Sequence, residues 1–591
     1  MAADDPQSPL DRLRRRRQQA AEQWRNRLAH VDALPQLTVL GLLSGLLAGG
    51  VIVAFRLAVE GPLGHWLPLS GENFEGLDAH WRFFLPVAGA LLIALLFIGL
   101  NRRHHPTGIL HVLDRLHNHQ GRLPKGNFFT QFCGGVLALL SGQSAGREGP
   151  VVHLGAASAS QLGQWLQLPN NSLRPLVACG VAAAIAASFN TPMAGVIFAM
   201  EVVLMEYTIA GFIPVILAAV AGTTITQLVF GPDIVFTEGQ QLTGNLSELP
   251  LMAGLGLLVA IAASAYIRLH TGCVQLTRQW PIGWRLVLAG LIGGVGGLLV
   301  PQVMGMGYDT IDSALAGQFT WQLLVLILVA KLIITGIVLG LGIPGGVIGP
   351  CLVMGACLGG AAGSAAGLLP GEVSESGVYV ILGMAAMMGA VLNAPLAAMV
   401  AIMELTYNPG ILFPGMLVVV VACLITRWLF RCEGLFSTLL ELEGKSNRPK
   451  LMQQLLSRTG VRSLMHRRYC HSECTLTRKQ ARAMLKLQPE WIVLQSKQLL
   501  VKPADLMRYL EQEAEDRPSE GAEPADQEET LDLMAIPATR LEMTSISPNA
   551  NLYEAWQALN QTQVDALYVP SIGGGISGLL TREQIETYYR L

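Results

Sequence analysis

The chain of 591 residues is 51% hydrophobic and only 14% charged. So few charges cannot cover a water-soluble globule of this size, and most of the chain must therefore face lipid. The formal net charge of −2 says little about partners, because the charges are segregated along the chain.

The N-terminal segment, about residues 1–36, is basic, with Arg12 and Arg14–Arg17 ahead of the first apolar run. By the positive-inside rule this predicts a cytoplasmic N-terminus, and we expect no cleaved signal peptide, since no short apolar stretch with a cleavage site comes first. Aromatic residues do not interleave with the arginines, which favours an amphipathic surface segment over a nucleic-acid-binding one.

Long apolar runs follow, beginning with Leu37–Phe55 and Phe83–Leu100. Each reaches the roughly 18 to 20 residues that a helix needs to cross a bilayer. Such runs continue to Phe430, after which charge rises at Arg431. The pattern predicts an all-α transmembrane domain over residues 37–440 and a soluble domain over residues 445–591.

The transmembrane region contains an internal repeat. Asn190-Thr191-Pro192 leads to Glu201 as Asn393-Ala394-Pro395 leads to Glu404, both at an offset of 203 residues. We therefore expect two similar halves, about 37–235 and 250–440. Transporters with such halves often bind their substrate where the halves meet, at helices interrupted by Gly and Pro.

Two glycine-rich loops, Ser144–Pro150 and Pro344–Pro350, precede corresponding helices of the two halves. Their free amides and the helix dipole make each helix start an anion site without a fixed cation. Glu148 aligns with Ile348, so only the first half carries an acid. We interpret Glu148 as a gate whose carboxylate competes with the anion and leaves when protonated. The alternative is a plain capping acid.

At these residues the chain resembles the CLC family of chloride channels and transporters. The motif Gly146-Arg147-Glu148-Gly149-Pro150 is intact, Gly346–Pro350 carries Ile348 at an aromatic position, and Pro106–Leu110 is a divergent first motif. The resemblance covers about 37–440 and implies a homodimer of inverted halves with tilted, broken helices and cytoplasmic termini. It implies an anion path contacting the following residues: Thr107, Gly108, Ile109, Gly146, Arg147, Gly149, Val347, Ile348 and Phe436.

Two departures from the family bear on proton coupling. Phe436 stands where relatives usually have a Tyr, and Val202 stands where proton-coupled relatives have a second Glu. Glu206, one helical turn from Val202, is either a substitute proton relay or a helix-end acid.

Other charged residues in the spans have two interpretations each. Lys331 either raises the local anion concentration at a pore mouth or extends to the interface, and Arg147 is expected to attract anions on the other side. Glu201 and Glu404 are expected to serve the fold by capping or pairing. Three histidines near the first motif, His104, His105 and His111, are expected at the surface or in a vestibule.

The soluble region, 445–591, resembles a pair of α/β CBS modules, each reading helix, strand, strand, helix, joined by an acidic linker at about 511–530. Such pairs often bind adenosine nucleotides through a Thr or Ser and an Asp three residues later. Here the candidates are Lys502 with Asp505 and Thr581 with Gln584, which favours a structural role. Cys470-His471 and Cys474, with His466 nearby, are too sparse to predict a metal site, and we expect no cofactor.

Chloride/proton exchange with loose coupling is the function that we favour, and an uncoupled chloride channel is the alternative. Nitrate and fluoride stay open as substrates, although Thr107 favours chloride. Another small solute would need more polar side chains in the loops, and a membrane enzyme is disfavoured because the spans show no catalytic constellation. The expected location is a bacterial inner membrane.

Overall fold

The computed structural model describes residues 22–30, 33–67, 73–232, 236, 248–368, 374–445, 451–515, 530–571 and 575–590. They belong to two compact units, a helical unit within 34–166 and 173–448 and an α/β unit within 1–33, 167–172 and 449–591. The basic stretch before residue 22 and most of the expected acidic linker, residues 516–529, lie outside the described residues.

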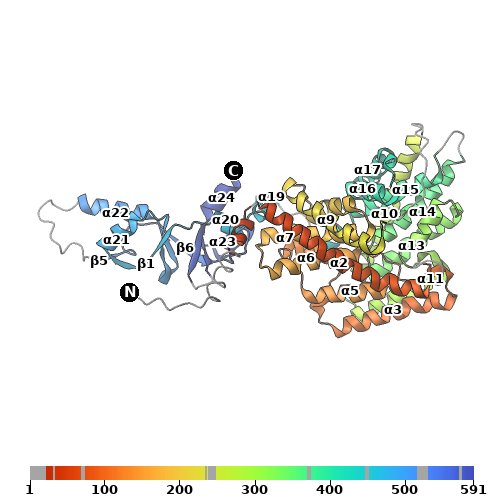
Figure 1. Ribbon diagram of the computed structural model, residues 1–591, viewed down its shortest axis with the longest axis horizontal. Helices are drawn as coiled ribbons and strands as arrows, with labels where there is room; N and C mark the ends of the chain where they lie inside the picture. Colours follow the sequence, from red (N-terminus) through yellow and green to blue (C-terminus); the bar gives the residue numbers. More distant parts are fainter. Residues whose placement is uncertain are drawn as a thin grey trace. The chain divides into compact units, whose positions relative to one another are not determined.

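The helical unit consists of two series of helices in the same order (Figure 1). The first series is α2 (Leu34–Trp66), α3 (Ala79–Gly99), α4 (Gly108–Asn118), α5 (Lys125–Leu140), α6 (Glu148–Trp165), α7 (Asn170–Phe189), α8 (Pro192–Phe198), the π-helix η3 (Ala199–Leu204) and α9 (Ile209–Phe230). The second is α10 (Leu249–Thr277), α11 (Ile282–Leu299), α12 (Tyr308–Leu315), α13 (Trp321–Gly340), α14 (Ile348–Ala366), α15 (Ser376–Leu392), α16 (Pro395–Thr406) and α17 (Leu412–Trp428), after which α18 (Leu435–Leu442) follows. Short 3-10 turns lie at Phe74–Gly76, Arg102–His104, Pro301–Val303 and Pro409–Ile411.

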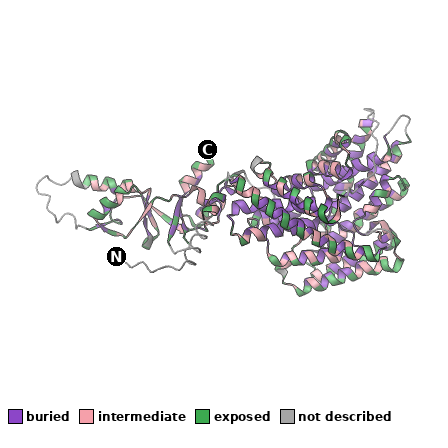
Figure 2. Ribbon diagram, viewed as in Figure 1, coloured by how far each residue is buried: buried purple, intermediate pink, exposed green. Residues whose placement is uncertain are grey.

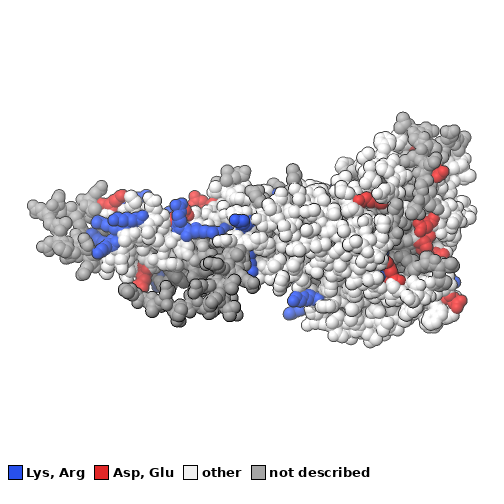
Figure 3. Space-filling view, in the orientation of Figure 1, with Lys and Arg blue, Asp and Glu red and all other residues white. Residues whose placement is uncertain are grey.

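Among the described residues, nine helices are long and apolar enough to cross a membrane. The apolar runs predicted from the sequence lie in α2 and α3. Outer helices such as α3 expose leucines, for example Leu95 at 67%, whereas α7 is almost wholly buried, and Figure 2 shows this contrast. The helical unit has few charged side chains on the face in Figure 3. This distribution is that of a multi-pass membrane protein, with lipid in place of water at the outer helices.

Small residues bring corresponding helices together in both halves. A Cβ on Gly155 of α6 would collide with the Gly180 carbonyl of α7, and one on Gly355 of α14 with the Gly383 carbonyl of α15. Since membrane helices gain most from close backbone packing, glycine at these four positions permits the tight inner layer.

The repeated Asn-x-Pro segments form matching helix boundaries. Asn190 and Asn393 have φ of 56° and 55°, the left-handed conformation that ends a helix, and Pro192 and Pro395 begin the next. Proline suits a first helical turn because it lacks the amide hydrogen that would be unpaired there.

Glu201 and Glu404 each cap a helix in the other half. Glu201 accepts hydrogen bonds from the Leu396 and Ala397 amides at the start of α16, and Glu404 accepts from Met193 and Ala194 at the start of α8. The prediction that these two acids serve the fold is confirmed, and the contacts tie the halves together.

The α/β unit contains one six-stranded sheet in the order β1-β3-β4-β6-β7-β8 and a two-stranded sheet of β2 and β5. Its strands are β1 (Tyr469–Ser472), β2 (Thr475–Thr477), β3 (Trp491–Leu494), β4 (Leu499–Val501), β5 (Thr530–Asp532), β6 (Arg540–Ser545), β7 (Ala566–Pro570) and β8 (Ile576–Thr581). Its helices are α19 (Leu451–Ser457), α20 (Val461–Leu464), α21 (Arg478–Lys486), α22 (Pro503–Glu515), α23 (Leu552–Thr562) and α24 (Arg582–Arg590).

The α/β unit contains two similar modules. In each module two strands are parallel, and the second of them also pairs with a third, antiparallel strand. In the first copy β1 lies parallel to β3, which pairs with β4, and in the second β6 lies parallel to β7, which pairs with β8. The duplicated β-α-β-β-α order agrees with the CBS-like prediction. The predicted linker begins too early, because residues 511–515 still belong to α22.

Candidate anion site

The two glycine-rich loops meet at one point between the halves. Gly146 and Gly346 form an isolated antiparallel bridge, with N···O distances of 2.8 Å and 2.7 Å. Helix α6 begins two residues after the first glycine and α14 two residues after the second. Two helix N-termini therefore start side by side, which concentrates unpaired amide groups there.

Glu148 is fully buried at the first position of α6. Its Oε1 accepts a hydrogen bond from the Gly349 amide at 2.7 Å, so the carboxylate caps the helix of the other half. The Ile348 amide and its own amide also face the carboxylate. The side chain therefore occupies a position with the geometry and polarity that suit a small anion.

As long as this carboxylate lies here, two neighbouring positions have room only for glycine. A Cβ on Gly146 or on Gly346 would collide with Glu148 Oε2, and one on Gly346 would also lie 2.5 Å from the Gly149 nitrogen. The loops thus leave room for one carboxylate or ion and no side chain of their own.

Ile348 and Val347 stand at the matching start of α14, and both are buried. Ile348 lines a small apolar cavity of about 30 Å³ together with Leu352 and Phe198. The second half therefore contributes amides from its loop and an apolar wall from its side chains.

The Thr107 loop lies at the start of α4, and its amides are only partly available. Gly108 has φ of 74° and donates its N–H to Gln131 Oε1 at 2.6 Å. This amide was expected to contact the anion, but its hydrogen is already bonded to Gln131. Within the described residues, the Thr107 hydroxyl makes no capping bond to its own helix. Ile109 is buried one residue further on. Thr107 therefore retains a donor for a ligand, whereas Gly108 does not.

A cavity of about 830 Å³ opens beside Thr107. Four cations and two acids line it: Arg103, Arg115, Arg285, Lys445, Asp114 and Glu443. Burial lowers the pKa of Lys445, but hydrogen bonds with Glu443 and Asp114 outweigh that effect and raise it, so this amine stays charged. The excess of cations attracts small anions into the cavity.

The three histidines near the first motif all line this cavity. This agrees with the vestibule alternative, although His111 is only 4% exposed and lies 2.9 Å from His153, measured between ring nitrogens. Arg115 Nε donates to the other ring nitrogen of His111 at 3.2 Å.

Phe436 is buried in the first turn of α18, which packs against α4, α10 and α15. The helix that carries Phe436 therefore adjoins the helix that begins at Gly108. The ring supplies bulk there and no hydrogen-bond donor.

Arg147 and Lys331 are both more enclosed than expected. Arg147 Nη1 lies 3.1 Å from Glu60 Oε1, and Glu60 also pairs with Arg56 at 2.8 Å. Lys331 is fully buried and donates to the Val303 and Gly305 carbonyls, so it does not extend to the membrane interface. Both side chains are held by protein groups.

Val202 is buried inside the π-helix η3, and Glu206 lies beyond its end in a half-buried position before α9. After Asn190 and after Asn393, the next residue with a left-handed backbone is Met205 and Tyr407, respectively. The first interval is one residue longer than the second. The π-turn absorbs this additional residue, as π-bulges usually do. The sequence repeat alone gave no sign of it.

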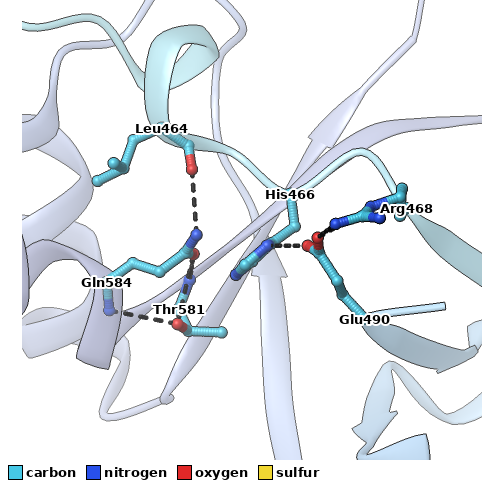
Figure 4. Close-up of polar contacts among 6 residues, drawn as sticks. All are labelled: Leu464, His466, Arg468, Glu490, Thr581 and Gln584. Atoms are coloured by element: carbon cyan, nitrogen blue, oxygen red, sulfur yellow. Dashed lines mark hydrogen bonds and ion pairs between the residues drawn. The ribbon is translucent and has the colours of Figure 1, made fainter. Parts of the chain in front are cut away.

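The nucleotide-site candidates in the α/β unit are occupied by internal contacts. Gln584 accepts from the Thr581 amide at 2.9 Å and donates to the Leu464 carbonyl at 3.1 Å (Figure 4). In the other copy Asp505 accepts from the Thr539 amide at 3.1 Å.

An ion-pair cluster lies beside Gln584. Glu490 pairs with His466 and with Arg468, the latter at 2.8 Å (Figure 4). Burial raises the pKa of Glu490, but the contacts with Arg468 and His466 outweigh it and lower the pKa overall. In the described part of the chain, no three His, Cys, Asp or Glu side chains are grouped to hold a metal.

Sequence reasoning missed three residues that organise the membrane site: Gln131, His153 and Glu60. Each is distant along the chain from the residue that it contacts, which is Gly108, His111 or Arg147. Their polar character within apolar helices was the available signal, since buried polar groups need partners.

Comparison with known proteins agrees with this architecture. The family model described as voltage gated chloride channel matches residues 89–427. A ClcB-like chloride channel protein of Ralstonia nicotianae is 33% identical over 394 residues, covering 64% of this chain and 91% of that protein. The voltage-gated ClC-type chloride channel ClcB of Salmonella typhimurium is 29% identical over 409 residues, covering 66% and 96%.

Solved structures share the fold. A slow cyanobacterial Cl⁻/H⁺ antiporter matches with a TM-score of 0.62 and 24% identity, over 70% of this chain and 99% of that one. A eukaryotic CLC transporter matches with a TM-score of 0.60 and 19% identity, over 93% and 98%. The second match extends over most of the α/β unit as well.

Two halves whose helix N-termini meet at a buried carboxylate define a polytopic membrane protein of duplicated architecture. Since the family model covers more than half of the sequence, the chain belongs to the voltage-gated chloride channel family, CLC. The expected fold class is confirmed: a helical transmembrane domain of CLC type followed by a smaller α/β domain.

Proposed function

We propose that this protein transports chloride across a membrane along a path gated by Glu148, and that it exchanges chloride for protons with loose stoichiometry. One observation carries the proposal: the Glu148 carboxylate accepts a hydrogen bond from the Gly349 amide at 2.7 Å, at the helix start where an anion would bind. Protonation weakens this contact and frees the position, which links proton and anion occupancy.

Further features of the structure also support anion transport along this path. The basic cavity beside Thr107 would collect chloride at one end of the path, and Arg147, which precedes Glu148 in the chain, would attract anions at the other. The names of the relatives agree, since they are chloride channel proteins and the cyanobacterial structure is a Cl⁻/H⁺ antiporter. We place the protein as a homodimer in a bacterial inner membrane, with both termini cytoplasmic.

Uncoupled conduction is the second candidate. Val202 is buried and cannot carry a proton, and Phe436 lacks a hydroxyl. Exchange then needs Glu206 or a water chain to supply Glu148. Glu206 lies half-buried at the end of η3, a position that allows either a relay or a structural role.

The deciding experiment uses proteoliposomes that contain only this protein. A chloride gradient is applied, internal pH is followed, and the membrane potential is clamped with potassium and valinomycin. We expect uphill proton movement that disappears in Glu148→Ala. Chloride flux without proton movement between pH 4.5 and 7.5 would make the protein a channel. Competition with nitrate and fluoride in the same vesicles identifies the preferred anion.

For the α/β domain we propose a structural role without nucleotide binding. Gln584 and Asp505, which stand where nucleotide-binding pairs have an Asp, are already hydrogen-bonded within the domain. Calorimetric titration of the full-length protein with ATP and AMP should give no binding signal. Saturable binding that is lost in Thr581→Val would contradict this role.

A further inference from the structure

Helix α5 contacts all three loops of the anion site. Asn127 Nδ2 donates to the Pro106 carbonyl at 2.8 Å, in the loop before Thr107. Further along the helix, a Cβ on Gly134 would lie 2.9 Å from Pro344 and one on Gly135 would lie 2.9 Å from Pro150. One face of α5 therefore abuts the three segments whose relative placement shapes the path.

Gln131 stands at the centre of this face and is fully buried. Its Oε1 accepts from the Gly108 amide at 2.6 Å, and its Nε2 donates to the Pro344 carbonyl at 3.3 Å. An amide nitrogen can only donate and a carbonyl oxygen can only accept, so both partners require the same orientation of the carboxamide. Gln131 thus bridges the first loop of one half to the loop of the other.

We propose that Gln131 is a positioning residue for the part of the anion path at Thr107: its carboxamide fixes the Thr107–Gly108 turn against the Pro344 turn and so sets the place of the Thr107 hydroxyl on the path. The proposal rests on the proposed function, because Thr107 acts as a ligand only if the anion passes it. With the Gly108 amide committed to Gln131, the hydroxyl is the donor that the turn offers the anion.

The chemistry of the side chain explains why glutamine suits this position. An apolar side chain of similar length would leave the Gly108 N–H and the buried Pro344 carbonyl without these partners, which is costly in a membrane interior. A cationic or acidic side chain would pair with only one of them and would add charge beside a permeating anion. A neutral donor and acceptor in one group meets both needs.

A double-mutant cycle tests the proposal. Chloride affinity is measured by calorimetry on the purified full-length protein for wild type, Thr107→Val, Gln131→Met and the double variant. If Gln131 positions the hydroxyl, each single change weakens binding severalfold, and the double variant binds no more weakly than Gln131→Met alone. Losses that multiply in the double variant, or an unchanged affinity in Gln131→Met, would overturn the proposal.

Gln161→Met is the matched control, because Gln161 lies on α6 and donates to the Leu123 carbonyl, away from the three loops. We expect it to lower the melting temperature without changing chloride affinity. An equal loss of affinity in this control would mean that general destabilisation, and not positioning, explains Gln131→Met.

A second variant keeps the proposal testable if Gln131→Met fails to fold. Gln131→Glu preserves the size of the side chain, and when protonated it can still accept from Gly108 and donate to Pro344. In a Glu148→Gln background, where the gate no longer titrates, chloride affinity should fall as pH rises and the new carboxylate ionises. A flat pH profile would overturn the proposal. Absence of chloride binding by wild type would instead refute the proposed function.

Discussion

At the scale of single residues, the competition between Glu148 and the anion can be tested directly. Glu148→Gln keeps the shape of the side chain but removes its charge and its titration. We expect chloride flux in liposomes to rise and most of its pH dependence to disappear. Glu404→Gln provides the control, since it is the same substitution in a membrane helix but at a capping position. An unaltered flux and pH profile in Glu148→Gln would contradict the gate.

The two bridging glycines give a second prediction. A methyl group at Gly146 would meet chiefly the Glu148 carboxylate, which can swing away, whereas at Gly346 it would also meet the backbone nitrogen of Gly149. We expect Gly146→Ala to fold and to raise chloride flux, with no further effect in a Glu148→Ala background. Gly346→Ala should express poorly, because backbone must move.

Liposome flux and gel-filtration profiles of both variants check this pair. A lower chloride flux in Gly146→Ala, or equal expression and flux in the two variants, would contradict this prediction.

Glu148 could be identified from the sequence because only one of the two equivalent loops carries an acid. Gln131 could not, since nothing in a run of apolar helix residues says that its partners are Gly108 and Pro344. The same holds for Arg147, whose pairing with Glu60 depends on how α2 packs against α6. Roles that arise from a residue's own motif are predictable, and roles that arise from packing of distant helices are not.

At the scale of elements, the reciprocal caps should carry measurable stability. Each of Glu201 and Glu404 satisfies two amides at the first turn of a helix in the other half. Glu201→Gln and Glu404→Gln should each lower stability by about 1 kcal/mol, the usual order for a lost cap. Thermal unfolding in detergent measures the loss, and similar values are expected because the contacts are symmetric. A change in transport pH dependence in either variant would mean that the acid also titrates during transport.

From the repeat we expected Glu201 and Glu404 to cap or pair and the helices after the two glycine-rich loops to correspond, but it gave no sign that one half has η3 where the other has a regular α16. One additional residue after Asn190 decides the difference, because a helix can absorb it only by a local π-turn. Val202, which stands where proton-coupled relatives have a second Glu, lies within this turn.

At the scale of the whole transmembrane domain, several contacts besides the Gln131 bridge join the halves near the anion site. They are the Gly146–Gly346 bridge, the Glu148 contact with Gly349, and the two reciprocal caps. The backbone bridge pairs two equivalent glycines, the Glu148 contact reaches the residue after its equivalent Ile348, and each cap joins an acid of one half to a helix start of the other. Duplication was readable from the sequence, but the site depends on this mutual pairing, which only the folded halves create.

This pairing predicts that the covalent link between the halves is dispensable once the protein has folded. A protease site inserted between residues 240 and 241, cut after reconstitution, should leave chloride flux intact, and both fragments should elute together in mild detergent. The uncut protein with the same insertion is the control for the insertion itself. Adding Glu201→Gln and Glu404→Gln should make the cut protein separate at lower detergent stringency, because two of the contacts between halves are weakened. Immediate loss of flux on cutting, with an active uncut control, would mean that the connection and not the pairing holds the anion site together.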